Sequence, residues 1–447
     1  MILGEKIKAI YMIGIKGTGM SSLAVILKKM GYKITGSDTS EKFFTEEQLK
    51  RNGIKYFEKF DKKNIKKANS DLIIISTAYG KNHPELKEAK KIGKNILTYP
   101  EVVGLMSQNL HSIAICGSHG KTTTTAMLGE IMRDQAIILV GSIAKMSNSK
   151  NPKFFIFEAD EYQNKFQYYS PQNVILTNID YDHPDFFKTE FQYIKTFKKF
   201  INKTLSKRGV IVYNYDDGGS RKILDKSGEN IVNFGFDKKS QYQIKNINND
   251  LNKFEIFKSN ERIINLKLST YGKHNILNAT AAALMAMRFG IKKEMIQEAL
   301  LKFKGVKRRM EIIPSKKYLI IDDYGHHPTE ISATLIAIRN KYKDKNIVAV
   351  FHPHTFTRTK ALFKDFGKSF EDANLTIVID IYPSAREKAG GVHSKDLVKE
   401  IMKNKSRAIY QSTISDSARY INKNIKKGSV IVTIGAGDIW KLCKLIK

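Results

Sequence analysis

The segment CGSHGKTTTT, residues 116–125, follows the apolar run Ile113–Ile115 and opens a helix-like stretch. This succession of strand, glycine-rich loop and helix is the context that a phosphate-binding loop requires. Glycines let backbone N–H groups surround an anion, and the helix N-terminus adds its positive dipole end. The amino group of Lys121 can reach the terminal phosphates, and the Thr122 hydroxyl can hold Mg²⁺. The segment therefore predicts that the chain binds ATP together with Mg²⁺.

The spacing of the glycines is unusual. Only Ser118 and His119 separate Gly117 from Gly120, whereas the general phosphate loop has four residues between its first Gly and the Gly-Lys pair. This shorter form narrows the class of protein. The alternative interpretation is a glycine turn that caps an ordinary helix, but such a cap does not need Lys and Thr directly after the last glycine.

Length and composition indicate a chain of several domains. With 447 residues and 42% hydrophobic content, we expect about three domains, each with its own core. No apolar run is long enough to cross a bilayer, and Met1–Ala9 lacks a signal-peptide pattern, so we expect a cytoplasmic protein without membrane insertion. Cys116 and Cys443 are too few and too far apart for a disulfide framework or a cysteine metal cluster.

The formal net charge is +32, from 76 basic and 44 acidic residues. Such a charge can indicate a nucleic-acid partner. Here the excess is Lys rather than Arg, it is spread along the chain, and it is not interleaved with stacking aromatic residues. The pattern favours incidental attraction of polyanions and predicts no specific nucleic-acid site.

The N-terminal part has the pattern of a nucleotide-binding βαβ unit. A β-prone run at Ala9–Ile13 leads into the glycine-containing segment Gly14–Ser21, which opens a helix through about Met30. The next strand, Lys33–Ser37, ends at Asp38. A further strand ends at Ser76, again on the carboxyl side where open α/β sheets bind ligands. This arrangement predicts a site for a nucleotide diphosphate.

Two strands of the second unit end in polar residues beside the phosphate loop. Phe154–Phe157 is followed by Glu158-Ala159-Asp160-Glu161, and Val174–Thr177 is followed by a segment that ends in Asp182-His183. Oxygen and imidazole ligands at this edge suit Mg²⁺ that bridges phosphate and substrate. Alternatively, Glu158 caps a helix and His183 is a structural histidine. The polar stretch 238–267 predicts a β-rich insertion.

An Ala-rich helix, Ala279–Arg288, follows a segment that carries His274 and Asn278. These two residues are four apart and so face the same side of the helix start, where an amide can read a base edge and a ring can pack on it. Helix capping by Asn275 is the alternative. Beyond a linker at 303–309, the chain predicts another doubly wound domain, with strands at Tyr318–Ile321, Ile347–Phe351, Thr376–Ile381 and Ser429–Ile434.

Eight segments, in the same order over nearly the whole chain, resemble the Mur ligase family. They are Gly17–Ser21, Gly117–Thr125, Glu158–Glu161, Asp182–His183, His274–Asn278, Arg308–Arg309, Asp322–Pro328 and Gly435–Ile439. The resemblance implies an α/β fold of three domains. These are a Rossmann-like UDP-sugar-binding domain at 1–108, a P-loop ATPase-type central ligase domain at 109–310, and a Rossmann-like C-terminal domain for amino acid and ATP at 311–447.

The activity that the resemblance implies is ATP-dependent amide-bond formation in peptidoglycan synthesis, on UDP-N-acetylmuramate and L-alanine. A carboxylate does not react with an amine at neutral pH because its oxygen is a poor leaving group. ATP therefore first phosphorylates the carboxylate, and the acyl phosphate then accepts the amine. Catalysis of the phosphoryl transfer is electrostatic and positional.

The resemblance also assigns roles to residues. For ATP they are Gly117, Ser118, His119, Gly120, Lys121, Thr122, Thr123, His274, Asn278 at adenine, Arg308 at the phosphates and Asp323 at the ribose. For the UDP-sugar they are Gly17, Thr18, Gly19, Met20, Ser21, Asp38 and Ser76. Thr122 and Glu158 would hold one Mg²⁺, and His183 a second between ATP and the muramoyl carboxylate. For the amino acid the residues are His327, His354 and Arg358, and for catalysis they are Lys121, His183 and Arg358.

Some of these roles have alternatives. A planar guanidinium such as that of Arg358 can grip the amino-acid carboxylate bidentately. Arg308 could instead be a surface charge at a helix end. His327 and His354 could be structural histidines beside prolines. No residue is identifiable as the base that deprotonates the amine.

Departures from the family pattern leave the acceptor open. Glu161-Tyr162-Gln163-Asn164 looks more like the murein-recycling members, which attach the L-Ala-D-Glu-diaminopimelate tripeptide to the same nucleotide sugar. The segment His354–Arg358 resembles the alanine-adding pattern instead, although Thr355 replaces an Arg. A non-catalytic nucleotide-binding scaffold is the third hypothesis. Lys198 is at a plausible distance for a carbamylated lysine but is not assigned, and we expect a monomer or weak homodimer.

Overall fold

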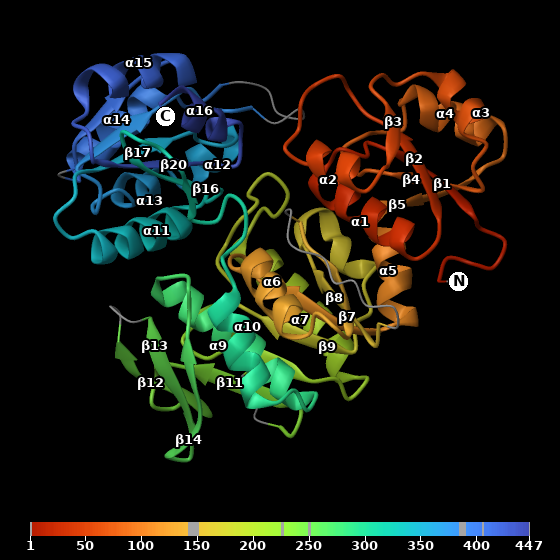
Figure 1. The fold of residues 1–447 in the computed structure, drawn as a ribbon, viewed down its shortest axis with the longest axis horizontal. Helices are drawn as coiled ribbons and strands as arrows, with labels where there is room; N and C mark the ends of the chain where they lie inside the picture. Colours follow the sequence, from red (N-terminus) through yellow and green to blue (C-terminus); the bar gives the residue numbers. More distant parts are fainter. Residues whose placement is uncertain are drawn as a thin grey trace.

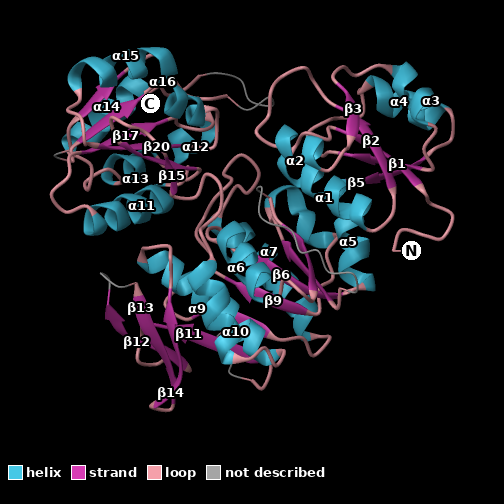
Figure 2. Ribbon diagram, in the orientation of Figure 1, coloured by secondary structure: helices cyan, strands magenta, loops and turns pink. Residues whose placement is uncertain are grey.

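Three α/β domains, each built on its own sheet, form the computed structural model of this chain (Figure 1). The structure describes residues 2–141, 152–224, 228–248, 252–383, 390–404 and 406–446. Helices flank all three sheets (Figure 2). The α/β class and the three-domain organisation expected from the sequence are confirmed.

The N-terminal sheet is parallel and has the strand order β3-β2-β1-β4-β5. Its strands are β1 Ala9–Ile13, β2 Lys33–Ser37, β3 Lys55–Phe57, β4 Leu72–Ile75 and β5 Asn95–Thr98, and its helices are α1 Thr18–Lys29, α2 Glu46–Arg51, α3 Lys62–Ala68, α4 Pro84–Lys91 and α5 Tyr99–Asn109. Apolar β-prone residues make up β1 and β4, which lie buried in the middle of the sheet. The predicted strands Ala9–Ile13 and Lys33–Ser37 are confirmed.

The central sheet has nine strands in the order β14-β13-β12-β11-β10-β9-β6-β8-β7. The strands are β6 His111–Cys116, β7 Ala136–Leu139, β8 Phe154–Glu158, β9 Asn173–Leu176, β10 Ile211–Asn214, β11 Ile231–Gly235, β12 Tyr242–Asn248, β13 Lys253–Lys258 and β14 Glu261–Lys267. The helices are α6 Lys121–Ile131, η1 Tyr162–Gln167, α7 Glu190–Leu205, α8 Gly218–Ile223, α9 Lys273–Arg288 and α10 Lys293–Lys302. The antiparallel strands β12–β14 are the predicted β-rich insertion.

The C-terminal sheet has the order β15-β16-β20-β17-β18-β19 and is parallel except for β15. The strands are β15 Glu311–Ile313, β16 Leu319–Asp323, β17 Ile347–Phe351, β18 Leu375–Val378, β19 Ala408–Tyr410 and β20 Val430–Ile434. The helices are α11 Pro328–Lys341, α12 Phe356–Ala361, α13 Phe363–Lys368, α14 Ser394–Lys403, α15 Ile414–Asn424, η2 Ile439–Lys441 and α16 Leu442–Leu445. β18 ends three residues before the predicted Ile381 because its neighbour β17 ends at Phe351, the register partner of Val378.

The three domains are joined in different ways. One apolar cluster runs from the N-terminal sheet into the central domain and includes Ile10, Val102 and Phe157. The C-terminal sheet has separate clusters on its two faces, around Phe351 and Ile377. The predicted divisions near residues 108 and 310 fall between the sheets, and their exact positions stay predictions. Among the described residues, no helix is both long and apolar enough to cross a membrane.

Candidate active site

The phosphate loop connects β6 to α6 at the carboxyl edge of the central sheet. Gly117 and Gly120 have φ angles of 137° and 80°, which favour glycine. A Cβ atom on Gly117 would lie 2.1 Å from Thr177 Oγ1, and one on Gly120 would lie 2.6 Å from Asn278 Oδ1. Both glycines are therefore required by backbone conformation and by close neighbours.

Lys121 begins α6 and turns its amino group back over the loop. The amino group donates to the carbonyl oxygens of Gly117 and Ser118 and lies 3.3 Å from Glu161 Oε2. Tyr193 donates to the other oxygen of Glu161 at 3.0 Å. Burial disfavours the charge of Lys121, but the surrounding carboxylates outweigh this and raise its pKa. A fixed positive charge therefore stands at the mouth of the loop.

A cavity of about 310 Å³ opens beside the loop, between the central and C-terminal domains. The predicted ATP-binding residues in its lining are His119, Gly120, Thr122, Thr123, His274, Asn278 and Asp323. Gly117, Ser118, Lys121 and Arg308 are not in this lining. The cavity thus brings together most of the predicted nucleotide residues from two domains.

His274 and Asn278 lie in the first turns of α9. The Asn278 amide is oriented from two sides, because its oxygen accepts from Thr124 Oγ1 at 3.1 Å and its nitrogen donates to Asn275 Oδ1 at 3.4 Å. Asn275 donates to the Tyr271 carbonyl oxygen, and α9 has no side-chain cap. Burial lowers the pKa of His274 to about 4, so its ring is neutral at pH 7.

Asp323 ends β16 on the opposite wall of the cavity. Its carboxylate accepts from the backbone N–H groups of Gly325 at 2.7 Å and Met310 at 2.8 Å. Burial nevertheless raises its pKa to about 6. The carboxylate is thereby held in one orientation toward the cavity.

Glu158 and Thr122 form a pair that fits a divalent cation. Glu158 Oε2 accepts from Gly141 N at 2.7 Å, and Thr122 also hydrogen bonds to this carboxylate. The other oxygen, Oε1, is buried and has no hydrogen-bond partner among the described residues. Burial raises the pKa of Glu158 despite these hydrogen bonds and the charge of Lys121. An unpaired buried carboxylate oxygen beside a hydroxyl is a donor set that suits Mg²⁺.

His183 forms a second group of possible metal ligands together with Asp160 and Glu161. One ligand atom from each of these three residues lies within 4.8 Å of the others. The ring of Tyr162 stacks on His183 with centroids 4.5 Å apart, and its hydroxyl donates to Asp185 at 2.6 Å. The resemblance gives His183 a second Mg²⁺, apart from the one at Thr122 and Glu158. In the structure the carboxylates of Glu161 and Asp182 each have an oxygen 3.7 Å from His183 Nε2.

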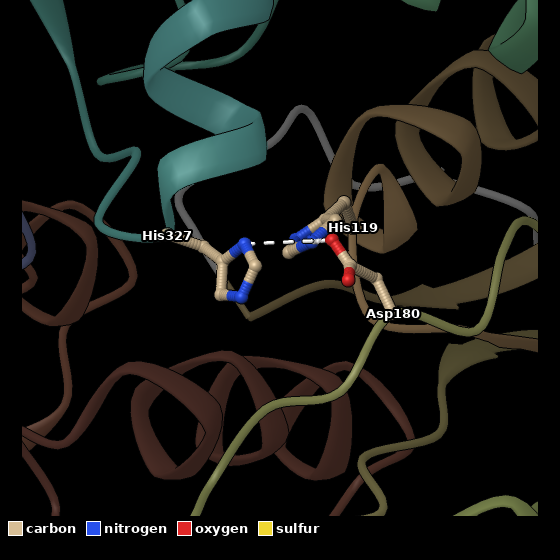
Figure 3. Close-up of side chains that lie close together, drawn as sticks. All are labelled: His119, Asp180 and His327. Atoms are coloured by element: carbon tan, nitrogen blue, oxygen red, sulfur yellow. Dashed lines mark hydrogen bonds and ion pairs between the residues drawn. The ribbon is translucent and has the colours of Figure 1, made fainter. Parts of the chain in front are cut away.

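A cluster of polar side chains joins the phosphate loop to the C-terminal domain (Figure 3). Asp180, which follows β9, lies 3.0 Å from His119 Nε2 and 3.5 Å from His327 Nδ1. Thr329 Oγ1 donates to the same carboxylate at 2.7 Å. On its other side, His119 Nδ1 lies 3.4 Å from Glu330 Oε1. The cluster connects three segments that are far apart in the sequence.

Arg358 also crosses between the central and C-terminal domains. Its Nε donates to Asp182 Oδ1 at 2.9 Å, and both side chains are 6% exposed. Its NH1 group lies 3.3 Å from His354 Nδ1. Burial disfavours the carboxylate of Asp182, but Arg358 and His183 hold its pKa well below the usual range. Arg358 and His354 are thus brought together, with Asp182 as an additional partner.

Arg308 is placed away from the cavity. Its guanidinium donates to Asp322 at 3.0 Å and to the carbonyl oxygens of Gly435 and Gly437. The side chain is 8% exposed, so it is not the surface charge of the alternative interpretation either. Its neighbour Arg309 lines the cavity. The pattern Arg308-Arg309 predicted an arginine near the phosphates, but the sequence does not show which of the two adjacent side chains faces the cavity.

The predicted UDP-sugar residues lie at the carboxyl edge of the N-terminal sheet. The Asp38 carboxylate is buried and accepts from Lys16 N at 2.7 Å and Thr39 N at 2.8 Å, and Tyr79 OH donates to it at 3.3 Å. Ser76 Oγ accepts from Ala78 N at 3.3 Å. Gly17 precedes α1, and Thr18, Gly19, Met20 and Ser21 form its first turn. These residues share one edge of the sheet.

Comparison with known proteins decides the family. Family models match three consecutive parts of the chain: "Mur ligase family, catalytic domain" at residues 9–111, "Mur ligase middle domain" at 115–286 and "Mur ligase, glutamate ligase domain" at 308–437. The UDP-N-acetylmuramate--L-alanine ligase of Pediococcus pentosaceus is 36% identical, with 98% of each chain covered. That of Lactiplantibacillus plantarum is 37% identical, with 99% of this chain and 98% of the relative covered. The chain belongs to the Mur ligase family.

Solved structures of Mur ligases agree in fold. The UDP-N-acetylmuramate-alanine ligase of Thermotoga maritima superposes with a TM-score of 0.81 at 26% identity and 98% coverage of both chains. A murein peptide ligase of Psychrobacter arcticus superposes with a TM-score of 0.71 at 25% identity, also with 98% coverage of both. The similarity therefore extends over the whole Mur ligase architecture.

Several residues of this Mur ligase's site had no role assigned from the sequence. Glu161 contacts Lys121, Tyr193 contacts Glu161 and Ser118, Arg309 lines the cavity, and Glu330 contacts His119 and lines the cavity. Glu161 and Arg309 lie inside recognised motifs and Glu330 lies two residues beyond Asp322–Pro328, so their position was a usable signal. Tyr193 in α7 gave no such signal. Lys198 lies exposed on α7, and its carbamylation stays an open prediction.

Proposed function

We propose that this chain is an ATP-dependent ligase that joins L-alanine to the lactyl carboxylate of UDP-N-acetylmuramate, with ADP and phosphate as the other products. The observation that carries the proposal is the convergence of one phosphate loop, buried carboxylates and a cross-domain arginine on one centre. Full-length similarity to UDP-N-acetylmuramate--L-alanine ligases supports the choice of substrates. Peptidoglycan precursor synthesis is the process that such a product serves.

ATP is proposed to bind in the cavity between the central and C-terminal domains. Asn278 would read the adenine edge beside His274, and Asp323 would accept from the ribose. The N–H groups of the loop Gly117–Gly120 and the amino group of Lys121 would hold the phosphates. We propose Arg309 in place of Arg308 as the arginine near the phosphates, because Arg309 lines the cavity.

We propose that Thr122 and Glu158 would hold one Mg²⁺ and that His183 would hold a second, toward the substrate carboxylate. When bound, the cation would neutralise charge on the phosphoryl group that is transferred. Lys121 contributes a fixed positive charge at the same place, and Glu161 with Tyr193 keeps its amino group oriented. These groups act on position and charge, so the attacking carboxylate oxygen and the γ-phosphorus are aligned without covalent participation of the protein.

The amino acid is proposed to enter from the C-terminal domain. Arg358 would bind its carboxylate, and His354 and His327 would line the pocket. Asp182 fixes the guanidinium through Nε, which leaves the plane of Arg358 defined before the substrate arrives. The UDP-sugar is proposed to bind at Gly17–Ser21, Asp38 and Ser76, so that its lactyl carboxylate extends toward Lys121.

The test is phosphate release from ATP with UDP-N-acetylmuramate and one acceptor at a time. L-alanine, glycine, L-serine and the L-Ala-D-Glu-diaminopimelate tripeptide are compared, and the amide product is identified by mass. We expect release and product with L-alanine. Turnover with the tripeptide alone would instead assign the murein-recycling reaction, whose family members the segment Glu161–Asn164 resembles.

A further inference from the structure

Glu330 places its two carboxylate oxygens on two different parts of the site. It is the third residue of α11 and closes a capping box with His327. Its side chain is 12% exposed and lies in the lining of the nucleotide cavity. A carboxylate facing a site for polyphosphate is unfavourable unless cations neutralise it.

The Oε1 atom faces the nucleotide side. It lies 3.4 Å from His119 Nδ1 in the phosphate loop and accepts from Arg309 NH1, also at 3.4 Å. Both partners line the cavity. One oxygen therefore orients the side chains of two cavity residues, one from the phosphate loop and one from the linker 303–309.

The Oε2 atom faces the amino-acid side. It accepts from the backbone N–H groups of His326 at 2.9 Å and His327 at 3.3 Å. The His326 ring lies 6.0 Å from that of His354, and His327 Nε2 lies 3.3 Å from the Tyr181 carbonyl oxygen. The second oxygen therefore fixes the backbone of the loop that carries His327, one of the proposed amino-acid-binding residues.

We propose that Glu330 is a positioning residue that couples the two substrate sites, because its Oε1 orients His119 and Arg309 while its Oε2 fixes the His326–His327 loop. A displacement of the phosphate loop when ATP binds is transmitted through one rigid carboxylate to the amino-acid pocket. The coupling rests on the proposed ligase activity. A capping role alone would affect only the stability of α11.

The experiment compares Glu330→Gln, which keeps the size and removes the charge, with wild type, His119→Gln and the double variant. We expect Glu330→Gln to lower kcat/KM at least 10-fold both for ATP and for L-alanine, with UDP-N-acetylmuramate affinity within twofold of wild type. The loss in the double variant should be much smaller than the product of the two single losses, because the residues act through one contact.

The matched control is Glu101→Gln. Glu101 closes the same kind of capping box at the start of α5, with Thr98, in the N-terminal domain. Its substitution should lower Tm without changing either kcat/KM. Glu330→Gln behaving like Glu101→Gln, an effect on ATP alone, or losses that multiply in the double variant would each overturn the coupling. A wild type without turnover on any acceptor would remove the proposed function and the coupling with it.

Discussion

At the residue scale, His119 is the most unusual member of the phosphate loop. Burial opposes its protonation, but hydrogen bonds and the negative charges of Asp180 and Glu330 outweigh burial and raise its pKa to about 9. The imidazole therefore carries a proton at pH 7 and adds a positive charge beside the phosphates. An ordinary glycine cap needs no histidine, whereas here the contacts to Asp180 and Glu330 give His119 an electrostatic role.

His119→Gln is expected to destabilise the protein in a pH-dependent way. Because the folded pKa is raised above the usual value of about 6.5, the stabilisation is fully present below pH 6.5 and is lost as the pH rises through about 9. The upper limit of this contribution to the free energy of unfolding is about 3 kcal/mol. Thermal unfolding of both proteins from pH 6 to 9.5 checks this. A Tm difference that stays constant over that range would contradict the charge assignment.

Lys121→Ala is expected to abolish turnover while it leaves the UDP-sugar site intact. The variant removes the charge that stabilises the transferred phosphoryl group, so kcat should fall by about 10³-fold or more. Calorimetry with UDP-N-acetylmuramate should give an unchanged Kd. Lys267→Ala, an exposed change at the end of β14, is the control. Loss of UDP-sugar binding in Lys121→Ala would point to a folding defect.

At the scale of elements, function depends on the junction between β6 and α6. β6 places Gly117 in van der Waals contact with the end of β9, so the loop and the neighbouring strand pack as one unit. Asn178 continues this packing, because its side-chain oxygen accepts from His119 N at 2.9 Å. The loop shape is therefore set by the adjacent strand as well as by its own glycines.

Gly117→Ala is expected to disrupt nucleotide binding. The added Cβ would collide with Thr177 Oγ1 at 2.1 Å, and the φ of 137° is strained for any other residue. We expect a Tm lower by several degrees and loss of ATP-analogue binding in calorimetry. Gly31→Ala also has a positive φ but nothing within 4 Å of the added atom, so it separates backbone strain from collision. Equal effects of the two variants would refute the packing explanation.

The elements were largely predictable because local pattern determines them. Apolar β-branched runs such as Ile347–Phe351 become buried central strands, and the glycine loop marks its own strand and helix. Pairings between domains were not predictable. The Arg358–Asp182 pair joins residues 176 positions apart, and the choice between Arg308 and Arg309 depends on which side of the backbone faces the cavity. Residue type and spacing predict neither the pairing of Arg358 with Asp182 nor which of the two arginines faces the cavity.

At the scale of the whole molecule, the C-terminal domain is attached differently from the N-terminal domain. The N-terminal domain shares an apolar cluster with the central domain. The C-terminal domain meets the central domain through polar contacts, among them Arg358 with Asp182 and Thr329 with Asp180, and through Tyr271, which packs partly buried against the C-terminal core. Apolar cores are close-packed and resist displacement, whereas a few polar contacts can be exchanged for ligand or water. Domain movement is therefore expected mainly at the C-terminal domain.

Asp182→Asn is expected to loosen this attachment. Removing one partner of a buried ion pair leaves the other charge uncompensated, at a cost of about 3–5 kcal/mol. Small-angle scattering should show a larger radius of gyration, with faster amide exchange at residues 326–330. Glu47→Gln, which removes an exposed contact to Lys307, should leave the radius unchanged. An unchanged radius in Asp182→Asn would show that other contacts hold the domain.

The two cysteines have a practical consequence. Cys116 ends β6 under the phosphate loop and Cys443 lies in α16, both free and buried, and burial raises the pKa of each thiol. Neither can react with an alkylating reagent until its surroundings open. One thiol lies in the central domain and the other in the C-terminal domain. Mass spectrometry of peptides distinguishes the two, so their alkylation rates report the opening of each domain separately. If a ligand slows the alkylation of one of these thiols, that ligand closes the domain that contains it.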